Sequence, residues 1–77
     1  MEVYLEYNAK FSLRKLSEYA LEHHFEIYEI QRGKIKTLSG EMGTLVFSID
    51  LVQKLNHTEV LDGLYQLPGV EYLREIA

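Results

Sequence analysis

The sequence contains no cysteine and no tryptophan, only one proline, and no long apolar run. Without cysteine the chain has no disulfide framework, no CxxC redox pair and no thiolate metal site. Its longest uncharged stretches, such as residues 42–49, fall far short of the ~20 apolar residues that a membrane-spanning helix needs. Residues 1–6 also lack the basic patch and apolar run of a signal peptide. These absences predict a cytoplasmic location without direct membrane insertion.

Basic residues are in the minority, since eight Lys and Arg stand against twelve Asp and Glu for a net charge of −4. Affinity for nucleic-acid phosphates comes mainly from clustered Lys and Arg, so we expect no nucleic-acid partner. The rest of the composition is that of a soluble globule, with 47% hydrophobic and 26% charged residues. A length of 77 residues allows a single domain, residues 1–77, with one modest core.

The N-terminal part of the chain predicts a strand followed by a helix. Residues 3–8 alternate with a period of two, which is typical of a strand with one buried face. Ser12 is a suitable helix N-cap, and Leu16, Ala20 and His24 lie on one face of the helix that would follow.

The middle of the chain predicts a long hairpin. Residues 25–32 form the second predicted strand, but their apolar positions change phase near Tyr28. One extra residue there, a β-bulge, would turn both halves of the strand toward the core. Residues 32–34 are a candidate turn, residues 35–38 a hairpin arm, and residues 44–50 the third main strand.

The C-terminal part predicts a second helix and a last strand. Asn56 or Thr58 can cap the helix, and residues 68–69 (Pro-Gly) end it before a strand over residues 70–76. Gly63 inside this helix costs about 1 kcal/mol relative to alanine. We therefore expect a close packing contact at Gly63.

The element order β-α-β-β-α-β predicts an α+β, ferredoxin-like sandwich, in which a four-stranded antiparallel sheet carries two helices on one face. Seven apolar residues are expected between the sheet and the helices: Leu5, Leu16, Ile27, Leu45, Phe47, Leu64 and Val70.

Two stretches resemble the ACT domain, a small regulatory module of the same topology. Residues 24–30 (HFEIYEI) are similar to the pattern with which that family leaves its first helix. Residues 64–73 (LYQLPGVEYL) resemble its closing run, in which a glycine–valine pair follows a leucine and precedes another apolar residue. The resemblance implies a non-enzymatic, ACT-like regulatory or protein-interaction module that pairs as a homodimer.

The turn between the first strand and the first helix departs from the ligand-binding ACT pattern. In that family a glycine there lets an amino-acid effector approach the backbone, whereas residues 8–13 (NAKFSL) contain no glycine. We therefore expect neither a small-molecule effector nor a cofactor. ACT-like modules without the glycine include the soluble C-terminal domains of bacterial MgtC/SapB-type membrane proteins, so the resemblance implies a transport-related parent protein of this kind.

The histidines His23, His24 and His57 carry the competing hypothesis, a metal- or small-molecule-sensing domain. Adjacent helical residues point about 100° apart, so His23 and His24 are poorly placed to hold one ion. We expect His24 at the core edge and His23 in water near the helix C-terminus, where a protonated imidazole suits the helix dipole. None of the four serines lies in a nucleophile elbow, and we expect no catalytic residues.

The sheet face away from the helices is expected to carry Tyr4, Val46 and either Tyr72 or Leu73. An apolar and aromatic patch on such a face usually marks a contact surface, although strands favour these residue types in any case. We interpret the patch as a homodimer interface.

A small basic tip, formed by Arg32, Lys34 and Lys36, would occupy one face of the hairpin arm. It could contact a lipid head group or an acidic partner. The more ordinary interpretation is a solvated edge whose charges discourage pairing with another sheet.

Overall fold

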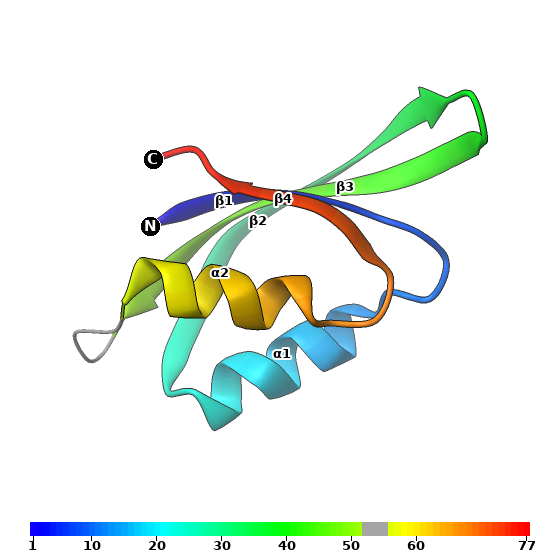
Figure 1. Cartoon of the computed structure of the whole chain (residues 1–77). Helices are drawn as coiled ribbons and strands as arrows, with labels where there is room; N and C mark the ends of the chain where they lie inside the picture. Colours follow the sequence, from blue (N-terminus) through cyan, green and yellow to red (C-terminus); the bar gives the residue numbers. More distant parts are fainter. Residues whose placement is uncertain (52–55) are drawn as a thin grey trace.

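The structure, a computed structural model, describes residues 1–51 and 56–77. Its element order is β-α-β-β-α-β, and both helices cover the same side of one antiparallel sheet (Figure 1). This is the ferredoxin-like α+β fold that the sequence predicts. The elements are β1 (Glu2–Tyr7), α1 (Leu13–Glu22), β2 (Phe25–Thr37), β3 (Gly40–Leu51), α2 (His57–Tyr65) and β4 (Val70–Glu75).

The sheet has the strand order β2-β3-β1-β4, so β1 lies inside the sheet and β2 and β4 form its edges. Val3 pairs with Phe47 and Leu5 pairs with Leu45 across β1 and β3, and all four side chains are fully buried at 0% exposure. The period-two alternation of β1 therefore places one set of side chains against the helices. The other set lies on the opposite side, which we call the open face.

Most of the residues predicted for the core are buried in the structure. Leu5, Leu16, Leu45, Phe47 and Leu64 are buried, and Ile27 packs partly buried against them. Val70 is only partly buried, because it stands at the first position of β4, where the chain enters the sheet. Five further residues complete the buried cluster: Val3, Ala20, Phe25, Ile49 and Val60.

The first helix begins as predicted, but it ends before His24. Ser12 caps α1, and its Oγ accepts a hydrogen bond of 3.2 Å from the backbone N–H of Lys15. His24 follows the helix in the left-handed conformation, with φ of 59°, and its side chain is exposed. The expectation that His24 covers the core edge is therefore wrong. The chain reverses at this residue, and Phe25, which is 4% exposed, takes the core position.

The predicted β-bulge is present, and it turns residues on both sides of it toward the helices, with the exception of Tyr28. The register between β2 and β3 shifts between Tyr28 and Gln31, and Glu29 has a φ of 55°. Because the extra residue falls after Tyr28, that side chain stays on the open face, opposite Ser48, and is 47% exposed. Ile30 lies beyond the bulge and turns toward α1.

The hairpin arm is longer than predicted, because residues 32–34 are not a turn. The ladder between β2 and β3 continues through them to Thr37 and Gly40, whereas β1 pairs with β3 only as far as Gly43. The two-stranded end of the hairpin, residues 34–42, projects from the body of the domain (Figure 1). We call it the arm. It accounts for the elongated shape of 39 × 22 × 20 Å.

The second helix confirms two predictions. Asn56 caps α2, since its side-chain oxygen accepts a hydrogen bond of 2.8 Å from the N–H of Thr58. Gly63 lies directly against the Tyr19 hydroxyl of α1, where a Cβ atom would overlap it. Within the described residues, neither helix has the length and apolar character needed to cross a membrane.

Candidate interaction surfaces

The open face carries an aromatic patch at the centre of the sheet. Tyr4 of β1 pairs with Val46 of β3, and its ring meets Tyr72 of β4 edge-on with ring centroids 6.1 Å apart. The Arg74 guanidinium lies over the Tyr4 ring at 5.9 Å, which is cation–π geometry. Tyr28, at the β2 end of the same face, adds a further half-exposed ring.

Of the two alternatives at the end of the chain, the structure places Tyr72 on the open face and Leu73 on the other. Tyr72 pairs with Glu6 and is 44% exposed, whereas Leu73 pairs with Leu5 and packs against the core. The patch therefore consists of Tyr4, Val46, Tyr72 and Tyr28. The sequence does not predict Tyr28 on the open face, because the face that its side chain takes depends on where in β2 the extra residue of the bulge falls.

Polar groups hold the Tyr4 ring in place. Its hydroxyl donates a hydrogen bond of 2.7 Å to Glu6 Oε2. This hydrogen bond to a carboxylate, helped by partial burial, raises the pKa of Tyr4 above its ordinary value of 10.0, while the nearby Arg74 charge opposes the shift. The Tyr4 ring is thus held as a neutral phenol between the Glu6 carboxylate and the Arg74 guanidinium.

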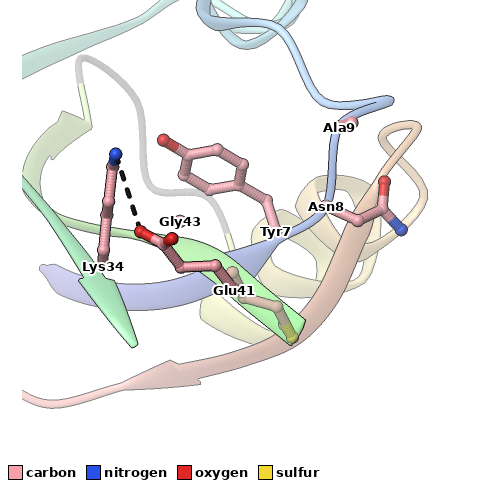
Figure 2. Close-up of a pocket in the computed structure, with 7 residues that line it drawn as sticks. Tyr7, Asn8, Ala9, Lys34, Glu41 and Gly43 are labelled. Atoms are coloured by element: carbon pink, nitrogen blue, oxygen red, sulfur yellow. Dashed lines mark ion pairs between the residues drawn. The ribbon is translucent and has the colours of Figure 1, made fainter. Parts of the chain in front are cut away.

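A hollow lies where the base of the arm meets the loop after β1 (Figure 2). The Tyr7 ring covers Gly43, where any side chain would overlap it, and packs at a tilt against Phe11 with centroids 4.5 Å apart. Lys34 and Glu41 form a cross-strand ion pair of 3.6 Å at the rim. Seven residues line this hollow: Tyr7, Asn8, Ala9, Lys34, Glu41, Met42 and Gly43.

Gly69 packs directly against the loop behind this hollow. Gly69 has a φ of +86°, and a side chain there would overlap the backbone of Phe11. The Asn8 N–H donates a hydrogen bond of 2.8 Å to the Gly69 carbonyl, and the Asn8 side-chain oxygen accepts one of 2.9 Å from the Lys10 N–H. These backbone and side-chain groups of Asn8 therefore form hydrogen bonds that stabilise the loop itself.

The three histidines have three different surroundings. His23 stacks on Tyr19 with centroids 4.2 Å apart, and its Nδ1 lies 3.1 Å from the Tyr19 carbonyl. His57 Nδ1 lies 3.0 Å from Glu75 Oε2 of β4. His24 is exposed after the helix end. Among residues 1–51 and 56–77, no three His, Asp or Glu side chains gather in a way that could hold a metal ion.

A second apolar surface, unnoticed in the sequence, lies between α1 and the edge strand β2. Its exposed large apolar members are Leu21, at 79%, and Ile30, at 45%. We call it the α1–β2 groove. Its lining is apolar apart from one hydroxyl and consists of Leu13, Leu16, Ser17, Ala20, Leu21, Ile27 and Ile30. Ile30 faces the groove only because of the bulge, so strand periodicity alone could not place it there.

Compared with known proteins, the chain matches no family model, no curated protein and no solved structure. The structure alone defines the fold class, which is ferredoxin-like α+β, with an aromatic open face and an apolar groove. The resemblance to the ACT domain, and the MgtC/SapB-type parent that it implies, stay predictions from residues 24–30 and 64–73.

Proposed function

We propose that this chain is a non-enzymatic, ACT-like protein-interaction module that pairs with a second copy through the open face of its sheet. The observation that supports the proposal is the aromatic patch. Tyr72 and Tyr28 are each about half exposed, and Tyr4 and Val46 lie between them on neighbouring strands. Aromatic residues are enriched at protein interfaces, where they supply large apolar area and little conformational freedom to lose.

A two-fold pair is the assembly that suits this surface best. One patch on a four-stranded sheet can face its own copy, which is the isologous contact of the commonest oligomers. A stable pair of this kind buries roughly 800 Å² on each partner. A regulatory role would follow if a partner favoured the paired or the separate state, because differential affinity shifts such an equilibrium.

The wider setting is proposed from the ACT resemblance alone. A pairing domain of this kind suits the cytoplasmic, C-terminal part of a bacterial MgtC/SapB-type membrane protein. There it would respond to a protein partner rather than to a small molecule. The reading frame upstream of Met1 tests this setting, and several hydrophobic spans encoded there would support it.

The pairing itself is tested by light scattering at micromolar concentration. We expect twice the monomer mass of 9.0 kDa for the unchanged protein and a single monomer mass for Val46→Lys, which places a charge in the patch. Gln66→Lys adds the same charge at an exposed position after α2 and should leave the pair intact. Circular dichroism confirms that each variant is folded.

Two results would contradict the proposal. One is a particle of 9.0 kDa for the unchanged protein across the micromolar range. The other is a pair that survives both Val46→Lys and Tyr72→Ser, because the contact would then lie on another surface.

A further inference from the structure

The charged residues of the arm all lie on one side of it. Arg32 of β2 pairs with the buried Leu45 of β3, so this pair marks the side of the sheet on which the helices lie. Side chains alternate along a strand, and the charged residues of the arm fall on the same side as this pair. They are exposed, because the helices cover the body of the sheet and not the arm (Figure 1). These residues are Lys34, Lys36 and Glu41.

The opposite side of the arm carries no charge and two large apolar side chains. Ile35 pairs with Met42 there, and Thr37 pairs with Gly40. In the described chain, neither Ile35 nor Met42 belongs to the core or to the side chains packed against it. A two-stranded hairpin alone in water is marginally stable at best. An apolar side on a hairpin of this kind therefore indicates a surface that another molecule covers.

This apolar side of the arm continues the aromatic patch of the open face. Successive open-face pairs of β2 and β3 are Gln31 with Val46, Gly33 with Thr44 and Ile35 with Met42. Only the small side chains of the middle pair separate the arm from the patch. A second copy seated on the patch therefore reaches the arm as well, and this continuity identifies that copy as the molecule that covers it.

We propose that in the open-face pair the arm of each copy lies on the aromatic patch of the other. Ile35 and Met42 then contact Val46 of the partner, beside its cross-strand neighbour Tyr4. The inference rests on the pairing proposed above and specifies its geometry. A two-fold axis over the pair of Gly33 and Thr44 produces this contact, because the arm pair and the patch pair lie at equal distances on either side of that axis.

Charge on the open face favours this orientation. Glu26 and Asp50 pair directly at the end of the sheet opposite the arm, and both are exposed. An arrangement that overlaps identical ends would bring these carboxylates of both copies together, which is unfavourable. In the proposed pair they lie farther from the axis than the last residue pair of the partner's arm. Glu6, nearer the axis, is already bonded to Tyr4 and lies diagonal to Arg74.

Thiol cross-linking tests the geometry, because the natural chain has no cysteine. Stacked sheets lie about 10 Å apart, so a bismaleimide of about that span joins residues that face each other across the interface. Thr44→Cys alone should cross-link two copies, because it lies at the axis. Met42→Cys mixed with tagged Val46→Cys should give severalfold more product than Met42→Cys alone, whose two thiols are displaced along the strands by about 13 Å.

Two cross-linking results would overturn the proposal. One is a Met42→Cys product as abundant as the mixed product, because identical ends would then overlap. The other is a mixed product no more abundant than that from Met42→Cys with tagged Gln66→Cys, an exposed position after α2.

Substitutions on the two sides of the arm show which side makes the contact. Met42→Lys places a charge where the proposal buries an apolar side chain, and it should raise the dissociation constant of the pair about tenfold or more. Lys36→Gln changes the charge on the other side by the same amount and should leave the constant unchanged. Sedimentation equilibrium measures each constant, and circular dichroism confirms that each variant is folded.

These measurements separate the arm contact from the pairing itself. A natural protein that stays monomeric across the micromolar range would overturn both proposals. A pair that Val46→Lys dissociates, but that Met42→Lys and Ile35→Lys leave at its original affinity, would overturn the arm contact alone and retain the open-face pair.

Discussion

The Tyr19 hydroxyl of α1 occupies the space that a side chain at Gly63 of α2 would fill. Tyr19 also stacks on His23 and meets Phe25 edge-on with centroids 5.6 Å apart, so its ring is held on two sides. Partial burial raises the pKa of the Tyr19 phenol above 10.0, in keeping with a side chain packed between α1 and Gly63 of α2. The distance between α1 and α2 at this point therefore depends on a glycine.

The first prediction is a reversal of sign at Gly63. Gly63→Ala should destabilise the domain by ~1–3 kcal/mol, because the new methyl group overlaps Tyr19 and displaces the ring. In a Tyr19→Ala background the same change should stabilise α2 by about 1 kcal/mol, which is the helix preference of alanine over glycine. Thermal and urea unfolding of the four proteins of this cycle measure both values. Equal effects of Gly63→Ala in the two backgrounds would contradict the contact.

The second prediction concerns the inner face of α2. Leu64 is fully buried beneath the sheet, so Leu64→Ala should cost ~2–5 kcal/mol of stability by leaving a cavity. A small domain with a single core has little stability to spare, and the variant is expected to be partly unfolded at 37 °C. Tyr65→Ala removes a neighbouring, 53% exposed side chain and serves as the control. If Leu64→Ala melts at the same temperature as the natural protein, the assignment of Leu64 to the inner face of α2 is wrong.

The third prediction is a loss of stability at alkaline pH. The pKa of Tyr4 is raised in the folded chain by its hydrogen bond to Glu6, so the folded state favours the neutral phenol. The resulting stabilisation is complete below about pH 10, the value for an unfolded tyrosine, and is lost as the pH rises through the higher folded pKa. Unfolding as a function of pH should show this decline, and Tyr4→Phe should make it shallower. An identical decline in Tyr4→Phe would exclude Tyr4 as the cause.

The fourth prediction is that free amino acids do not bind. In place of the glycine turn, the chain has Ala9, Lys10 and Phe11, and the Phe11 ring packs against Tyr7 beside the loop. A ligand that binds only the folded state raises its melting temperature by mass action. Each common amino acid at millimolar concentration should leave the melting temperature unchanged. A dose-dependent rise with any one of them would refute this expectation.

The fifth prediction addresses the metal-sensing alternative. His57 faces Glu75 and His23 faces the Tyr19 carbonyl, so the two imidazoles are occupied by different partners. Calorimetric titration with Zn²⁺ should give only heat of dilution. Saturable heat that disappears in His23→Ala or His57→Ala would instead favour a sensing domain.

Features that depend on residues close together in the chain could be predicted from the sequence. The cap at Ser12, the alternation of β1 and the presence of a bulge in β2 all follow from neighbouring residues, and the structure has each of them. Gly63 belongs to the same group, because a glycine inside a helix costs stability that a close contact can explain. These are short-range effects of hydrogen bonding, side-chain alternation and helix pitch.

Tertiary structure decided how those elements combine into surfaces. The position of the bulge after Tyr28, rather than before it, left that ring on the open face and turned Ile30 into the α1–β2 groove. The pairing of β4 with β1 placed Tyr72 outward and Leu73 inward, and the pairing of β2 with β3 carried β2 through residues 32–34 to a turn at Leu38. A strand's register comes from hydrogen bonds to a distant strand, and one residue of slip reverses every side chain. The sequence by itself therefore determined the fold and much of the core, whereas the faces available for contact depended on register.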